Sequence, residues 1–148
     1  MVTQQPAGHR ARIVVGVDGS AESVEALRWA ARQAELTGSE LRVLTAWEYP
    51  SFYGWAPANP GQTDFAHLAG QAQQDALGKV FGADPPDWVQ AQVTEGPTAR
   101  ALVDAAADAD LLVVGSRGHG GLADAVLGSV STYCVHHARG PVTIVRPG

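Results

Sequence analysis

A glycine-rich stretch late in the chain, residues 115–131, has the composition of a phosphate-binding loop. It holds five glycines, of which those at positions 115, 118 and 128 are spaced by two and nine residues, and hydroxyl side chains at Ser129 and Ser131. Glycine lets a backbone approach a ligand closely, and the N–H groups at a helix start attract anions. The stretch follows the apolar run Leu111–Val114 and precedes a segment that is compatible with a helix. We therefore predict a strand, a phosphate-binding loop and a helix start, in that order.

A carboxylate occupies the equivalent place after an earlier apolar run. Asp18 follows Ile13–Val17, and its oxygens can accept hydrogen bonds from the hydroxyls of a sugar. Aspartate is also common as a turn residue ahead of a helix. Ligands of parallel sheets bind beyond the carboxyl ends of the strands, which favours the binding interpretation for Asp18.

Two common nucleotide motifs do not describe this loop. The Walker pattern is absent, because no lysine follows a suitable glycine. Residues 118–123 fit the dinucleotide pattern G-x-G-x-x-A, but they follow the fourth predicted strand instead of the first. No acidic residue follows Asp124 to hold a ribose, so we set the dinucleotide interpretation aside.

Other reactive residue types favour structural interpretations. His119 lies in the glycine-rich loop without an orienting carboxylate, so we expect a solvated side chain rather than a general base. His136 and His137 are adjacent on a predicted helix and point about 100° apart, which argues against a shared metal ion. Cys134 lies among apolar residues, and we expect it to be a small buried side chain.

Composition and charge restrict the class of protein. A length of 148 residues is typical of one domain, and we predict a loose tail over residues 1–11 and a single domain over 12–148. The net charge is −5 and the basic residues are scattered, which argues against nucleic acid as a partner. The chain has no apolar run of membrane-spanning length and no signal-peptide core, so we expect a cytoplasmic protein that does not enter a membrane.

Apolar periodicity predicts alternating strands and helices. Such alternation is typical of a parallel sheet covered by helices on both faces. The long segment from Glu48 to Thr63 is rich in proline, glycine and aromatic residues, and it is either a lid or a satellite cluster over the core. The predicted strands are 13–17, 40–47, 88–93, 111–114 and 141–145, and the predicted helices are 20–38, 65–81, 96–107 and 129–138.

Four blocks of sequence, in the right order, closely resemble the universal stress protein family. They are Ile13–Ser20, Ala109–Gly118, Leu127–Ser131 and the segment from His136 to Val145. The glycine spacing G-x2-G-x9-G-[ST] is that of the family's ATP-binding branch. The resemblance implies a Rossmann-like α/β sandwich of three layers, with a five-stranded parallel sheet of order 3-2-1-4-5.

The resemblance also implies where an adenine nucleotide would bind. Asp18 would lie near the ribose and adenine, and the small side chain of Ala46 would leave room for the flat base. The phosphates would meet the glycines, the Ser129 hydroxyl and the amides that follow it, with a charge-assisted contact from Arg117. The implied binding residues are Gly16, Val17, Asp18, Ala46, Gly115, Ser116, Arg117, Gly118, Gly128, Ser129, Val130 and Ser131.

The function implied by the resemblance is that of an ATP-binding sensor or regulatory module in the stress response. Mg²⁺ could accompany the phosphates, and AMP or cyclic AMP could replace ATP. Two alternatives stay open, a slow Mg-dependent ATPase and a nucleotide-independent interaction protein that docks through its aromatic loop, Tyr49 to Trp55. The family commonly forms homodimers through the last strand, here Val142, Thr143, Ile144 and Val145. Such pairing would cover an apolar sheet edge.

Overall fold

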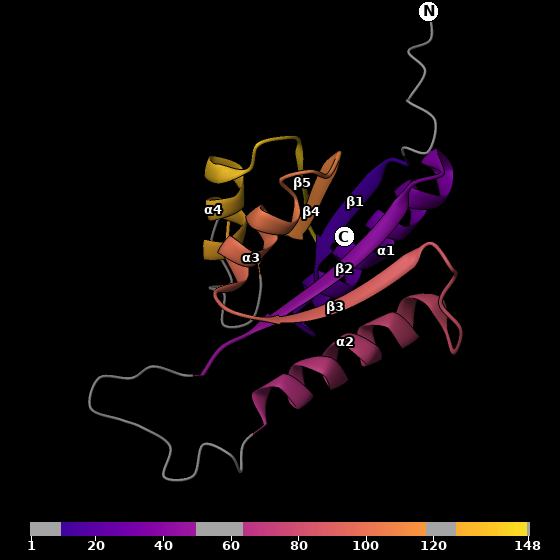
Figure 1. Ribbon diagram of the computed structural model, residues 1–148, viewed down its shortest axis with the longest axis horizontal. Helices are drawn as coiled ribbons and strands as arrows, with labels where there is room; N and C mark the ends of the chain where they lie inside the picture. Colours follow the sequence, from indigo (N-terminus) through magenta and orange to yellow (C-terminus); the bar gives the residue numbers. More distant parts are fainter. Residues whose placement is uncertain (1–9, 50–63, 118–126, 148) are drawn as a thin grey trace, which may run out of the picture.

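The computed structural model, which describes residues 10–49, 64–117 and 127–147, contains one parallel sheet (Figure 1). Five strands pair in the order β3-β2-β1-β4-β5, which confirms the predicted order 3-2-1-4-5. Residue Val15 at the centre of the sheet lies opposite Val43 on one side and Val113 on the other. The strands are β1 Arg12–Gly16, β2 Glu40–Trp47, β3 Val89–Glu95, β4 Leu111–Gly115 and β5 Val142–Val145.

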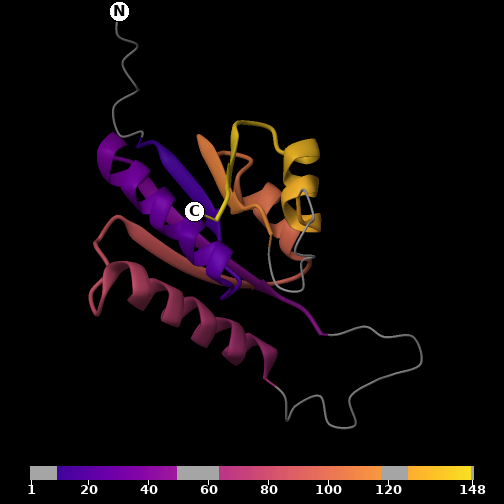
Figure 2. The same cartoon turned by 180° about the vertical axis from the view of Figure 1, so that it is seen from behind.

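Helices cover both faces of the sheet, as the three-layer prediction requires. Helices α1 (Ala21–Thr37) and α2 (Phe65–Phe81) pack on one face. Helices α3 (Thr98–Ala105) and α4 (Ser129–His137) pack on the other. The same cartoon seen from behind brings α1 in front of the sheet (Figure 2). This arrangement follows from right-handed crossovers, because the chain reverses its direction across the sheet after β3.

The core consists of two apolar layers that share the central strands. Ile13 and Val15 belong to the layer beneath α1 and α2, whereas Val14 belongs to the layer beneath α3 and α4. Successive strand residues face opposite sides of the sheet, so a strand that is buried on both faces is apolar throughout. Cys134 is fully buried in the second layer, as predicted.

The first helix begins and ends where the sequence predicts. The Ser20 hydroxyl accepts a hydrogen bond from the Ser23 N–H at 3.2 Å, which is a typical N-cap contact. Gly38 ends the helix in the left-handed region, with φ of 67°. Other ends shift by one to two residues: β3 runs to Glu95, because it stays paired with β2 as far as Trp47.

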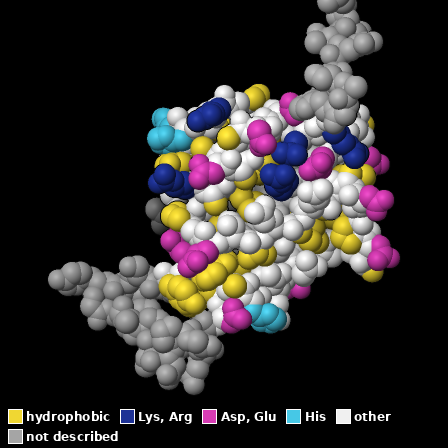
Figure 3. All heavy atoms as spheres, in the orientation of Figure 1, with side chains coloured by type: hydrophobic (Ala, Val, Ile, Leu, Met, Phe, Trp, Pro, Cys, Tyr) yellow, Lys and Arg dark blue, Asp and Glu magenta, His cyan; other side chains and the backbone are white. Residues whose placement is uncertain are grey.

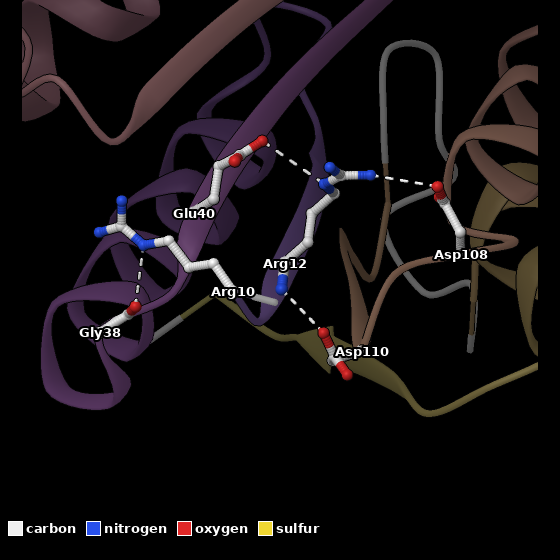
Figure 4. Close-up of polar contacts among 6 residues, drawn as sticks. All are labelled: Arg10, Arg12, Gly38, Glu40, Asp108 and Asp110. Atoms are coloured by element: carbon white, nitrogen blue, oxygen red, sulfur yellow. Dashed lines mark hydrogen bonds and ion pairs between the residues drawn. The ribbon is translucent and has the colours of Figure 1, made fainter. Parts of the chain in front are cut away.

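Ion pairs and hydrogen bonds join the elements at the amino edge of the sheet (Figure 4). The Arg12 guanidinium lies 3.4 Å from Glu40 and 3.1 Å from Asp108, and its backbone N–H donates to Asp110 at 2.8 Å. Arg10 donates from Nε to the carbonyl of Gly38 at 3.1 Å. These contacts stabilise the edge opposite the carboxyl ends of the strands. In the part of the chain that the structure describes, no helix is long and apolar enough to cross a membrane.

Candidate functional site

The sheet has its topological switch point between β1 and β4. These neighbours are parallel, and the connections that follow them lead to helices on opposite faces. In such sheets a crevice opens at the carboxyl ends of the two strands. Asp18 follows β1 there, and Ser116 and Arg117 follow β4. The structure thus brings the two candidate segments of the sequence to the same edge.

The Asp18 carboxylate is held in place by the start of α1. Its Oδ1 accepts hydrogen bonds from the Ser20 N–H at 2.9 Å and the Ser20 hydroxyl at 2.5 Å. The Asp18 N–H donates to the hydroxyl oxygen of Ser23 at 3.2 Å. The side chain of Asp18 is half-buried, so its position at the strand end is defined by the turn around it.

The neighbouring strand β2 places Ala46 next to this turn. Gly16 lies opposite Leu44, and the Val17 N–H donates to the Leu44 carbonyl at 3.0 Å. Ala46 follows two residues later on the same strand and is half-buried. A side chain at position 16 would clash with the core, because a Cβ on Gly16 would lie 2.8 Å from Cδ1 of the buried Leu102. The glycine at this position is therefore explained by close packing against α3.

The end of β4 packs closely against the first turn of α1. A Cβ on Gly115 would lie 3.1 Å from the backbone carbonyl oxygen of Glu22. Nη2 of Arg117 lies 3.8 Å from Oε1 of Glu22, and both side chains are about one quarter exposed, at 24% and 25%. Ser116 is buried and donates its N–H to the Val145 carbonyl at 2.9 Å. Glu22 is thus a neighbour of both Gly115 and Arg117.

Helix α4 begins beside the same strand end without a side-chain cap. Gly128 is its N-cap, with φ of −72° and ψ of 170°. The Gly128 N–H donates to the Ser116 carbonyl at 2.7 Å. Ser129 is exposed and Val130 is half-buried, whereas Ser131 is fully buried. A helix of nine residues therefore directs its partly positive end toward the switch point.

Sequence reasoning missed two residues of this region. Neither Glu22 nor Ser23 is among the binding residues that the sequence predicts. Ser23 is buried and donates its hydroxyl to the Ser20 carbonyl at 2.9 Å. The spacing of Ser20 and Ser23 resembles a capping arrangement and could have indicated this contact. The pairing of Glu22 with Arg117 depends on the tertiary fold and has no local signal.

Some predicted features lie outside the described residues. Gly118, His119 and most of the aromatic segment, residues 50–63, belong to this group. Of the aromatic segment, Tyr49 is described, and its ring packs edge-on against Trp47 and Phe65 with centroids 5.3 and 5.4 Å apart. Figure 3 shows apolar side chains gathered near the end of β2. Tyr49 thus joins the end of β2 to the start of α2.

The histidines and the cysteine of α4 have structural surroundings. The ring of His137 stacks on Tyr133 with centroids 4.1 Å apart, and His136 is exposed. Among the described residues, no three His, Cys, Asp or Glu side chains come together in a way that could hold a metal ion. Burial raises the pKa of the Cys134 thiol to about 11, which leaves it protonated and unreactive at neutral pH.

Comparison with known proteins relates this fold and site to one family. A sequence profile described as the universal stress protein family matches residues 9–146. A universal stress protein of Mycolicibacterium smegmatis is 39% identical over 145 residues, which covers 90% of this chain and 47% of the relative. A universal stress protein of Mycobacterium tuberculosis is 36% identical over 141 residues, with the same coverage of 90% and 47%. The chain therefore spans about half the length of the curated relatives it matches.

Solved structures share the architecture. Universal stress protein UspA from Lactobacillus plantarum has a TM-score of 0.77 at 22% identity, covering 94% of this chain and 99% of that chain. A universal stress protein solved in complex with cAMP has a TM-score of 0.58 at 29% identity, covering 93% of this chain and 97% of that chain. A universal stress protein from Archaeoglobus fulgidus, at 22% identity and a TM-score of 0.54, was solved in complex with dAMP and covers 91% of this chain and 97% of that chain.

Proposed function

Because the chain belongs to the universal stress protein family, we propose that it binds an adenine nucleotide, with ATP as the physiological ligand. The nucleotide binds at the carboxyl edge of β1 and β4, in a single domain over residues 12–148. The protein acts as a nucleotide-dependent sensor in the cytoplasm. It carries the glycine spacing of the ATP-binding branch, Gly115, Gly118, Gly128 and Ser129.

One observation carries this proposal. The N-terminus of α4, which lacks a side-chain cap, lies beside the end of β4, and the Asp18 turn follows β1, the strand paired with β4. This arrangement offers backbone donors for phosphate and a carboxylate for ribose at one edge. The 29% identical universal stress protein solved with cAMP supports an adenine nucleotide as the ligand class.

Each part of the nucleotide has a matching group. Asp18 accepts hydrogen bonds from the ribose, and Ala46 lies beside the base. The backbone of Gly128, Val130 and Ser131 surrounds the phosphates, and Ser129, whose side chain is exposed, contacts a phosphate or joins the shell of a bound Mg²⁺. Arg117 adds a positive charge on the side of β4.

Binding without turnover is the activity that these residues favour. The carboxylates described around the site are engaged, since Asp18 accepts two bonds from Ser20 and Glu22 lies 3.8 Å from Arg117. Neither is disposed as a general base for a water molecule. We therefore favour the sensor over a slow ATPase, and release of phosphate over many turnovers by the pure protein would reverse that preference.

We also propose a homodimer in which β5 pairs with β5 of a second copy. All four residues of this edge strand are half-buried, and Ile144 packs on the core of its own subunit. Thr143→Lys puts a charge in the middle of the edge without removing that core contact. Light scattering should report a dimer for the wild type and a monomer for the variant.

Calorimetric titration tests the nucleotide site. ATP and cAMP are titrated in the presence of Mg²⁺ into the wild type and into Asp18→Asn, which keeps the shape of the side chain but loses its charge. Asp110→Asn is the matched control, because Asp110 lies at the opposite, amino edge of the sheet. We expect weaker binding only for Asp18→Asn. Absence of binding by the wild type, or equal affinities of all three proteins, would refute the site.

A further inference from the structure

The carbonyl oxygen of Ser116, just after β4, accepts hydrogen bonds from two residues at the start of α4. The Ser116 N–H donates to Val145 on β5 at 2.9 Å, which fixes this residue to the sheet. Its carbonyl oxygen then accepts a hydrogen bond from the Gly128 N–H at 2.7 Å. The last residue before α4 is thus bonded directly to the first residue after β4.

A second donor reaches the same carbonyl from inside the helix. Oγ of Ser131 lies 3.1 Å from the Ser116 carbonyl oxygen and 3.0 Å from the Gly128 carbonyl oxygen. A serine hydroxyl has one proton, which these two acceptors share. Ser131 is only 1% exposed, so its side chain points into the protein and away from any ligand at the surface.

We infer that Ser131 is a positioning residue for the phosphate site, a role that rests on the proposed function. Its hydroxyl fixes the first turn of α4 to the end of β4 and so sets where the amides of residues 129–131 point. The nucleotide site is then preformed on the phosphate side. The family motif ends at Ser129, whose side chain is exposed, and the two serines thus have different roles.

The geometry explains why a buried hydroxyl serves this purpose. Removing Oγ leaves the Ser116 carbonyl with one donor from α4 instead of two, at a buried residue. Loss of a hydrogen bond in such a place shifts the equilibrium toward the displaced helix start by about tenfold. The affinity for phosphate falls in proportion to the population of the correct helix start, so this factor is the upper limit of the loss.

The experiment compares ligands with and without phosphate. ATP and adenosine are titrated into the wild type, Ser131→Ala, Ser131→Thr and the control Thr132→Ala, whose side chain is exposed on the same turn. We expect Ser131→Ala to lose up to about tenfold in ATP affinity, with the adenosine affinity unchanged. Ser131→Thr retains a hydroxyl that can bond the carbonyl three residues before it, and it should restore ATP binding. Thr132→Ala should match the wild type.

A readout without nucleotide separates this inference from the proposed function. Amide hydrogen exchange at Gly128 should be about tenfold faster in Ser131→Ala than in the wild type, because the helix start opens more often. Unchanged exchange at Gly128, unchanged ATP affinity, or equal losses for ATP and adenosine would each overturn the positioning role. If Ser131→Ala does not fold, Ser131→Cys is measured in its place, because it keeps a side chain of similar volume with a weaker donor. The same results would support or overturn the positioning role. A wild type that binds neither ligand would refute the nucleotide site, and the Gly128 exchange rate would still decide whether Ser131 fixes the helix start.

Discussion

Nη2 of Arg117 lies 3.8 Å from Oε1 of Glu22, which joins the exit of β4 to the first turn of α1. The two residues come from opposite sides of the switch point and are each about three-quarters covered. Glu22 therefore places a negative charge next to the arginine that is proposed to contact phosphate. A nucleotide bound as proposed would therefore compete with Glu22 for this cation.

Glu22→Gln should increase the affinity for ATP. The substitution removes one negative charge near the phosphates and releases the guanidinium from its ion pair, which is worth roughly a threefold change for a partly exposed pair. Calorimetry at low and at physiological salt measures the effect, and the gain should shrink as salt increases. Glu25→Gln is the matched control, since Glu25 pairs with Arg28 at 3.6 Å on an exposed surface. A weaker affinity in Glu22→Gln would contradict the competition.

Gly128→Asp should change stability and binding in opposite directions. The backbone of Gly128, at φ −72° and ψ 170°, is the ordinary conformation of an N-cap residue. An aspartate there bonds the free amides of α4 and raises the free energy of unfolding by about 0.5 kcal/mol. Its charge would lie where the phosphates are proposed to bind, and it should lower ATP affinity on the order of tenfold.

Gly128→Asn is the control for that substitution, because it has the same shape without the charge. Urea unfolding and ATP titration are measured on both variants. We expect Asn to stabilise the helix in the same way and to bind ATP more tightly than Asp does. Equal ATP affinity of Gly128→Asp and the wild type would show that phosphate does not bind at this helix start.

Gly115→Ala should destabilise the fold by about 1–3 kcal/mol. The added Cβ would lie 3.1 Å from the backbone oxygen of Glu22, so the first turn of α1 must move. Gly78→Ala is the opposite control, because a Cβ at that position in α2 meets nothing within 4 Å, and we expect a gain of about 0.5–1 kcal/mol. Urea midpoints of the two variants should lie on either side of the wild type. A Gly115→Ala protein as stable as the wild type would mean that α1 accommodates the methyl group freely.

Cys134 should make the folded state less stable at high pH. Burial raises its pKa from 9.0 to about 11 in the folded protein. Between pH 9 and pH 11 the unfolded thiol ionises and the folded thiol does not, so this contribution is complete below pH 9 and declines above it. The difference in unfolding free energy between the wild type and Cys134→Ala should shrink across this range. A pH-independent difference would mean that the thiol is not desolvated.

The sheet and its helices could be predicted because their signals are local. Ile13–Val17 and Leu111–Val114 have no polar interruption, as in strands covered on both faces, whereas the strand order came from the resemblance to the family. The burial of Gln73 has no such local signal in the sequence. A glutamine in a helix is expected to face solvent, yet its amide is buried and lies 2.8 Å from the Gln92 carbonyl.

The described candidate residues lie at or beside the strand ends where the sequence places them, but the sequence does not give all of the reasons for their types. A glycine in a loop motif suggests close approach to a ligand, and from the sequence alone Gly115 had only that reason. The structure adds the contact with α1, which depends on how β4 packs against Glu22. Likewise, the inward direction of the Ser131 hydroxyl follows from the docking of α4 on β4, which no spacing of residues expresses.

The most direct test of the proposed phosphate site is an amide spectrum of the protein titrated with ATP and Mg²⁺. We expect the backbone N–H signals of Ser129, Val130 and Ser131 to shift most, together with those near Ala46, whereas the signal of Arg12 at the amino edge stays in place. A spectrum in which ATP leaves the signals of Ser129–Ser131 unchanged would contradict the claim that the start of α4 binds the phosphates.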